Sequence, residues 1–180
     1  GNAQKPFYGL LEQLPIPVLT TWKAIDLMGE DHPLYLGHPG SMGDRGANLI
    51  LQEADLLISI GSRIDTSLTA FNEPHFGKQA KKVVVDIDEK ELSRMNLSQV
   101  EVRAACDAGQ FLEQLQEECS KSTWEQQRQE WKEWLQSCHE TRDKYPVVTS
   151  RHRETAGVVS AYYFIDVLCR ALTPDDVIVP

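Results

Sequence analysis

The sequence lacks the features that mark several classes of protein. It has 180 residues with 18 basic and 27 acidic side chains, a formal net charge of −9, and so it offers no broad basic surface for nucleic acid. No apolar run approaches the roughly 18 residues needed to cross a bilayer, so the sequence predicts no membrane segment. These absences favour a globular protein, which we expect to be cytoplasmic.

Motifs for catalysis and metal binding are equally scarce. The cysteines form no C-x-x-C pair, which excludes a zinc ribbon and a redox pair and favours reduced thiols. The histidines are scattered, and neither H-E-x-x-H nor G-x-S-x-G occurs. The residues in question are Cys106, Cys119, Cys138 and Cys169, and His32, His38, His75, His139 and His152. The sequence therefore predicts no catalytic residue and no metal site in this chain.

Glycine, in contrast, is concentrated in residues 35–50, YLGHPGSMGDRGANLI. It recurs there at every third position: Gly37, Gly40, Gly43 and Gly46. This spacing matches neither the G-x-G-x-x-G fingerprint nor a Walker loop. Glycine permits positive φ and lets a flat or anionic ligand approach the backbone, and Asp44 or Asn48 can cap a following helix. From the residues alone, a ligand-binding loop and a structural turn both stay open.

Apolar runs alternate with helix-like segments over the first two thirds of the chain. Strands are expected at residues 17–21, 55–60 and 82–87, and helices at 6–14, 44–54, 88–95 and 107–119. The apolar runs at 55–60 and 82–87 do not alternate with polar residues, which is typical of strands covered on both faces. We therefore predict an α/β fold with an open, doubly wound, mainly parallel sheet of the six-strand type flanked by helices.

Two motifs follow expected strands, at the edge where such sheets bind ligands. In IGSRID, Gly61 ends a strand and is followed by Arg63 and Asp65. The Arg63 guanidinium can pair with a phosphate, or with Asp65.

The second motif is VVVDIDEKEL, which places Asp86 and Asp88 at the end of the next strand. A carboxylate there can accept hydrogen bonds from ribose hydroxyls. Asp88 can also be a helix N-cap, with Glu91 completing a capping box. Together with the glycine segment, these motifs predict a nucleotide site.

The character of the sequence changes after residue 120. We predict an amphipathic linker helix and loop over 121–157, with a tryptophan stripe that packs on a neighbouring domain, and a new helix and strand over 160–172 and 175–179. The expected domains are thus residues 1–120, 121–157, and 158–180, the last being the start of a truncated domain.

Three phrases resemble the central domain of thiamine-diphosphate (ThDP)-dependent enzymes of the acetolactate synthase type. They are IPVLTTWKAIDLMGEDHPLYLGHPGSMGDRGAN, ADLLISIGSRID and KKVVVDIDEKEL. A fourth, SAYYFIDVLCRALTPDDVIV, resembles the opening of that family's diphosphate-binding domain. The resemblance implies a Rossmann-like central domain, whose first strand would precede residues 1–3 and be missing here.

The resemblance also implies a cofactor site and a parent enzyme. FAD or another nucleotide would lie across Gly37, Gly40, Gly43, Asn48, Gly61, Arg63, Asp65, Asp86 and Asp88. The parent would act on 2-keto acids with ThDP and Mg²⁺ as a homodimer or tetramer. Its ThDP-binding domains would lie outside these 180 residues, so we expect the chain alone to be inactive.

Two alternatives remain at this point. A stand-alone nucleotide-binding module, like that of NAD-dependent deacylases, would need a catalytic histidine and usually a zinc module, and the missing C-x-x-C pairs argue against it. A structural spacer or dimerisation domain that has lost its nucleotide is favoured by Met42, Thr66 and Ser67, which replace the family's usual histidine and Asp-Arg.

Overall fold

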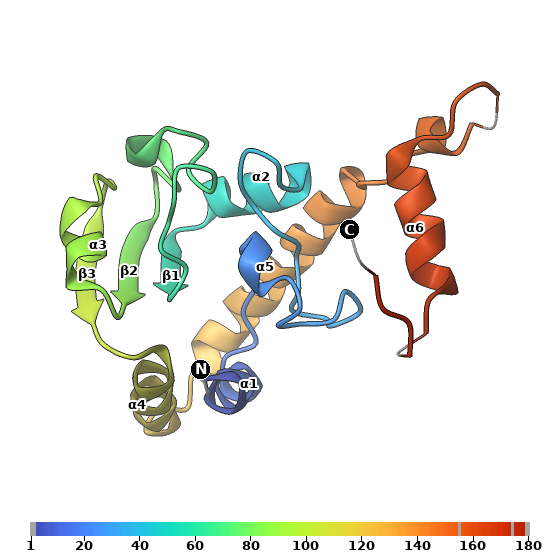
Figure 1. Cartoon of the computed structure of the whole chain (residues 1–180). Coiled ribbons are helices and arrows are strands. Elements are labelled where there is room, and N and C mark those ends of the chain that lie inside the picture. Colours follow the sequence, from blue (N-terminus) through green and yellow to red (C-terminus); the bar gives the residue numbers. More distant parts are fainter. Residues whose placement is uncertain (1–2, 155, 174, 179–180) are drawn as a thin grey trace. The chain divides into compact units, whose positions relative to one another are not determined.

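The computed structural model describes residues 3–154, 156–173 and 175–178 (Figure 1). The chain divides into two compact units, Gly1–Lys144 and Tyr145–Pro180. The first unit extends past residue 120 and includes the long helix expected as a linker. The resemblance relates residues 1–3 to a turn that follows the family's first strand. Of these residues, Gly1 and Asn2 lie outside the described part of the chain.

The elements of the first unit follow the predicted alternation. Its helices and strands are α1 (Gln4–Gln13), α2 (Arg45–Glu53), β1 (Leu56–Ile60), β2 (Lys81–Asp86), α3 (Glu89–Arg94), β3 (Val100–Ala105), α4 (Ala108–Ser120) and α5 (Glu125–Lys144), with 3₁₀ turns at Trp22–Ala24 and Glu73–His75. The second unit contains a 3₁₀ turn at Ser150–Arg153 and α6 (Ala161–Ala171). The predicted helices are confirmed, with ends that shift by a few residues.

The sheet is parallel, as predicted, with the order β1-β2-β3. The arrowheads of all three strands point the same way in Figure 1. Three strands among the described residues are fewer than the six-strand type that we expected. Residues 17–21 contribute one isolated parallel bridge, Val18 to Tyr35, in place of the predicted strand. Residues 175–178 form no strand, and residue 179 lies outside the described part.

Helices cover both faces of this sheet. Leu57 of β1 packs in a cluster with Leu51 of α2 and Leu92 of α3, whereas Ile60 packs with Leu10 of α1 and Leu112 of α4. Residues three apart on a strand point to opposite faces. The doubly wound arrangement is therefore confirmed, and it leaves the ends of the strands as the accessible edges.

The tryptophan-bearing helix α5 belongs to the first unit. Cys138 is 1 % exposed and packs with Leu36 and Ile50. A Cβ on Gly46 would lie 3.1 Å from the Arg142 Cα, so α2 and α5 approach closely at this glycine. The Arg142 guanidinium donates to the Tyr35 carbonyl at 3.1 Å. The tryptophans pack on residues of the predicted 1–120 region, since Trp124 and Trp131 contact the cluster of Leu10 and Leu112, and Trp134 contacts that of Leu36 and Ile50.

Lys82 lies fully buried near the amino end of β2, at the edge opposite the predicted site. Its ammonium donates to the carbonyls of Gly77, Ala80 and Ser98 at 2.7–2.9 Å. These carbonyls belong to the turns that lead into β2 and β3. A buried charge needs such hydrogen bonds, and here it fastens two turns together. Burial lowers the pKa of Lys82.

Candidate functional site

Asn48 holds the glycine segment from within. Its Oδ1 accepts from the Gly40 N–H and its Nδ2 donates to the Gly40 carbonyl, each at 2.9 Å. Gly40 adopts a φ of +129°, which side-chain-bearing residues rarely adopt. Asn48, which we predicted as a ligand-facing residue, therefore uses its amide to fix the loop.

Asp44 precedes α2 at the N-cap position but does not cap the helix with its side chain. Its Oδ2 instead accepts from the His38 N–H at 3.0 Å and lies 3.1 Å from the His38 Nδ1. Gly37 has a φ of +98°, and a Cβ there would lie 2.5 Å from the same oxygen. The carboxylate thus closes a turn over residues 37–44.

Gly43 fits only because it has no side chain. A Cβ at this position would lie 2.4 Å from the His38 carbonyl oxygen and 2.6 Å from the Pro39 carbonyl carbon. Neither is a flexible atom that could give way. Close packing within the chain therefore explains why glycines occur in this segment. The structural-turn interpretation is correct whether or not a ligand also lies on the loop.

The loop after β1 has an unusual backbone. Gly61, Arg63 and Ile64 all have positive φ, of 61°, 61° and 43°. For a β-branched residue this is a genuine outlier, and Ile64 is held there by a core in which it is 2 % exposed. Strain of this kind persists where the surroundings fix it, and it clusters at functional sites.

Arg63 does not pair with Asp65, which was one of the two predicted alternatives. Its Nη2 donates instead to the Glu91 Oε1 at 3.2 Å. Asp65 turns toward its own loop, where its Oδ1 accepts from the Leu68 N–H at 2.9 Å. Glu91, the partner of Arg63, lies in the DIDEKEL motif that we had noted, but we predicted that it would complete a capping box.

The predicted capping box forms only in part: the Asp88 cap is present, but the reciprocal bond to Glu91 is not. Asp88 caps α3 as predicted, with its Oδ1 accepting from the Lys90 N–H at 2.9 Å. The Asp88 N–H, however, donates to the Asp86 Oδ1 at 3.0 Å rather than to Glu91. The Glu91 carboxylate is engaged by two arginines, because Arg94 also binds it, on Oε2. Hydrogen bonds from Arg94 and then Arg63 lower the pKa of Glu91.

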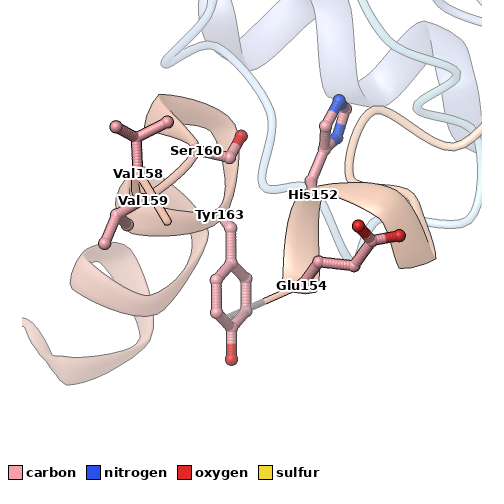
Figure 2. A pocket seen from close by; sticks show the side chains of 6 residues that line it. All are labelled: His152, Glu154, Val158, Val159, Ser160 and Tyr163. Atoms are coloured by element: carbon pink, nitrogen blue, oxygen red, sulfur yellow. The ribbon is translucent and has the colours of Figure 1, made fainter. Parts of the chain in front are cut away.

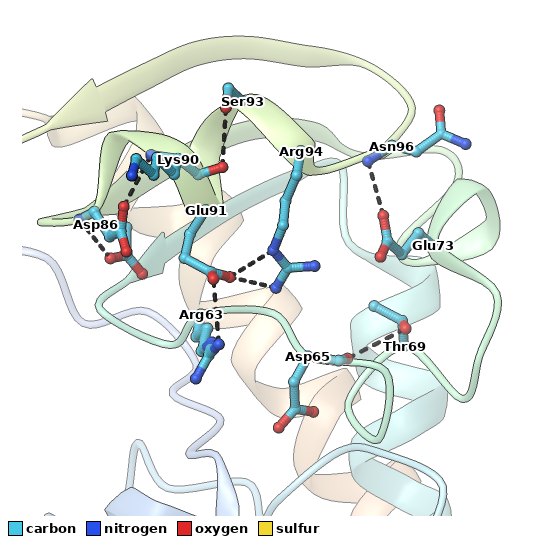
Figure 3. A network of polar contacts seen from close by, with 11 residues as sticks. Arg63, Asp65, Thr69, Glu73, Asp86, Lys90, Glu91, Ser93, Arg94 and Asn96 are labelled. Atoms are coloured by element: carbon cyan, nitrogen blue, oxygen red, sulfur yellow. Dashed lines mark hydrogen bonds and ion pairs between the residues drawn. The ribbon is translucent and has the colours of Figure 1, made fainter.

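The predicted residues converge through these contacts. The Ser41 N–H donates to the Ser67 carbonyl at 2.9 Å, which joins the glycine segment to the loop after β1. Arg63 and Glu91 then join that loop to α3, which follows Asp86 and Asp88 (Figure 3). Hydrogen bonds therefore link the three predicted loops to one another.

Two cavities lie elsewhere. One of about 250 Å³ is formed by α2 and the loop before β2, and of the predicted site residues it includes Asn48 alone. The other, of about 100 Å³, lies in the second unit. Figure 2 shows its lining residues, His152, Glu154, Val158, Val159, Ser160 and Tyr163. The His152 Nδ1 accepts from the Thr149 N–H at 3.2 Å, so this imidazole serves the local turn.

Other reactive groups are sparse. Among the described residues, no three His, Cys, Asp or Glu side chains gather as metal ligands would. Desolvation raises the pKa of Cys138 to about 12 and also raises that of Cys119, so both thiols are poor nucleophiles. No helix within the described ranges is long and apolar enough to cross a membrane.

Comparisons with known proteins identify the family of the chain. The family model described as "Thiamine pyrophosphate enzyme, central domain" matches residues 1–115. The chain belongs to this family, and its α/β sheet is that of the central domain. Among individual proteins, the chain is similar to acetolactate synthase large subunits.

Three such relatives illustrate the extent of the similarity. The subunit of Corynebacterium glutamicum is 30% identical over 97% of this chain and 27% of its own length. Isozyme 1 of Escherichia coli K12 is 39% identical over 59% of the chain and 19% of its own length. The protein of Cyanidium caldarium is 30% identical over 82% and 25%. The chain thus spans about a quarter of the length of the curated relatives it matches.

Proposed function

We propose that this chain is part of an acetolactate-synthase-like enzyme that joins or cleaves a bond next to the carbonyl of a 2-keto acid. Its central domain would bind a nucleotide, FAD in the first instance, on the surface where the three loops meet. The observation that supports the nucleotide proposal is the pair of links Ser41–Ser67 and Arg63–Glu91, which join separate sequence motifs by hydrogen bonds.

The residues at this surface fit the parts of a dinucleotide. The Arg63 side chain is 65% exposed and has five N–H donors, of which the bond to Glu91 uses one. The guanidinium can therefore also donate hydrogen bonds to a diphosphate. Asp88, just after β2, is exposed and has carboxylate oxygens suited to ribose hydroxyls, whereas Asp86 is 8 % exposed and already accepts from the Asp88 N–H.

Apolar side chains are also available there. Met42 is 90% exposed in the glycine segment and Ile87 is 75% exposed between the two aspartates. Such side chains can pack on the rings of a flavin or an adenine. FAD supplies a two-electron redox ring, which the joining of 2-keto acids does not require, so we assign it a structural role.

The ThDP chemistry is proposed for the whole enzyme. ThDP would supply the nucleophile for the keto carbonyl, and Mg²⁺ would accompany its diphosphate. We assign neither group to a residue of this chain. We propose that the remaining ThDP-binding domains and a second subunit, in a dimer or tetramer, complete the site, and we expect no 2-keto acid turnover by the 180 residues alone.

A cytoplasmic location is part of the same proposal. All four cysteines are free, and Cys119 and Cys138 are buried. Unpaired thiols in this number are usual in reducing compartments.

A structural spacer without nucleotide is the second candidate. It is favoured by the internal pairing of the polar groups at this surface. Asn48 binds Gly40, and Asp86 and Asp65 accept from N–H groups of their own loops. These bonds stabilise the loops in the absence of any ligand, so the surface does not need one in order to fold.

Flavin fluorescence separates the two candidates. If the nucleotide proposal holds, the protein should quench FAD fluorescence saturably, and Arg63→Ala should weaken the binding. Arg153→Ala, which removes an exposed arginine of the second unit, serves as the control and should leave it unchanged. Absence of quenching at high protein concentration would support the spacer.

A further inference from the structure

Glu91 receives two arginines from different parts of the fold. Arg63, from the loop after β1, donates to the Oε1 at 3.2 Å. Arg94, one turn further along α3, donates to the Oε2 through Nε at 2.7 Å and also through Nη2. Figure 3 shows the carboxylate between the two guanidinium groups.

The exposure of the three side chains is unequal. The Glu91 side chain is 15% exposed, whereas Arg94 is 45% and Arg63 65% exposed. The carboxylate is therefore the sheltered centre of the cluster, and Arg63 is its solvent-facing member. Two cations share one anion, so these three side chains carry a formal charge of +1, and the carboxylates of Glu73 and Asp88 also act on Arg94.

The backbone and the guanidinium of Arg63 are held by different interactions. Its backbone is held in the left-handed region next to Ile64, whose side chain is buried in the core. Its guanidinium is fixed by Glu91. A free arginine loses rotamer entropy when it is ordered, and a ligand that meets an ordered arginine does not have to supply that ordering.

We propose that Glu91 is a positioning residue of the nucleotide site: it holds the Arg63 guanidinium ready for the ligand's diphosphate. Arg94 balances the charge of Glu91, so that Arg63 keeps its attraction for an anion. This inference rests on the proposed nucleotide site and deepens it, because it assigns a role to a residue that need not touch the ligand.

The first experiment needs no ligand. Trypsin cleaves after Arg63 only when this segment opens, because Ile64 is buried. Glu91→Gln should accelerate cleavage at the Arg63–Ile64 bond by about three- to tenfold, the factor that corresponds to releasing one immobilised side chain. The matched control is Glu89→Gln, which makes the same charge change at an exposed position of α3 and should not alter the rate.

The second experiment measures FAD affinity in a double-mutant cycle. Glu91→Gln should weaken FAD binding by about three- to tenfold when Arg63 is present, and should have no further effect in the Arg63→Ala background. A general loosening of the loop would weaken binding in both backgrounds. Thermal unfolding checks that each variant is folded, and Glu91→Asp, which keeps the charge but shortens the side chain, replaces Glu91→Gln if that variant fails to fold.

The outcomes separate this inference from the proposal on which it rests. If the unmodified chain does not bind FAD, the nucleotide proposal fails, and the trypsin comparison still decides whether Glu91 holds Arg63. If the chain binds FAD but Glu91→Gln changes neither the cleavage rate nor the affinity, the positioning role is overturned and the nucleotide site stands. Equal weakening in both Arg63 backgrounds also overturns it.

Discussion

The Asn48 side chain binds both backbone polar groups of Gly40: its Oδ1 accepts from the Gly40 N–H and its Nδ2 donates to the Gly40 carbonyl, each at 2.9 Å. The side chain lies in the first turns of α2, and the peptide lies eight residues earlier in the glycine segment. The conformation of this segment is thus set by the helix that follows it.

Asn48→Ala should destabilise the fold by about 2 kcal/mol, because it leaves the Gly40 N–H without its partner and removes one of the two N–H donors to the Gly40 carbonyl, which keeps the bond from the Gly43 N–H. Chemical denaturation measures the loss. Asn96→Ala is the matched control, since the Asn96 side chain is exposed and should cost little. Equal stability of the two variants would contradict the structural role of Asn48.

Gly43→Ala should destabilise by about 3 kcal/mol or prevent the turn from closing, since the added methyl meets backbone atoms at 2.4 and 2.6 Å. Gly29→Ala is the control, because a Cβ at Gly29 has no heavy atom within 4 Å. The difference in melting temperature between the two alanine variants is the measurement. A tolerated Gly43→Ala would mean that the turn adopts another conformation.

Glu91 should make the stability of the fold depend on pH in the acidic range. Its pKa in the folded chain lies below the ordinary value of 4.5, so the unfolded chain binds the proton first as the pH falls. The contribution of Glu91 is complete above that value and is lost as the pH falls through the folded-state pKa. Melting temperatures between pH 6 and pH 3 should therefore fall less steeply for Glu91→Gln than for the unmodified chain. Parallel curves would show that the two arginines do not stabilise the carboxylate.

Lys82→Met should destabilise by about 3 kcal/mol, because the carbonyls of Gly77, Ala80 and Ser98 lose the ammonium that binds them, and of these the Gly77 carbonyl keeps the bond from the Ala80 N–H. The neighbouring Lys81→Met is a close control, since Lys81 is exposed and points to the other face of the sheet. Urea denaturation compares the two. If both variants unfold at the same concentration, the bonds of Lys82 contribute nothing net.

Much of the fold follows from local patterns. β1 and β2 are continuous apolar runs, and the helix expected from residue 107 begins where Asp107 caps α4 by accepting from the N–H groups of Gly109 and Gln110. β3 was missed because Glu101 and Arg103 interrupt its apolar residues. Arg103 has a structural use there, since it donates to the carbonyls of Leu92 and Met95 at the end of α3.

The site was harder to predict than the fold. Sequence patterns identified the three loops, but they could not identify the partner of each polar group. Arg63 and Glu91 are 28 positions apart, and only the parallel pairing of β1 with β2 brings their loops together. Spacing likewise gave no means of telling that Lys82 is buried while Lys81 is exposed.

The Lys82 ammonium occupies a place that a potassium ion could take in another protein, among backbone carbonyls with no carboxylate bonded to it. A bound ion exchanges with the solvent, and a site that depends on it empties when the ion is scarce. Here the cation is attached to β2 by its own side chain and cannot diffuse away. The amino-terminal edge of the sheet therefore carries its own cation, covalently attached to β2.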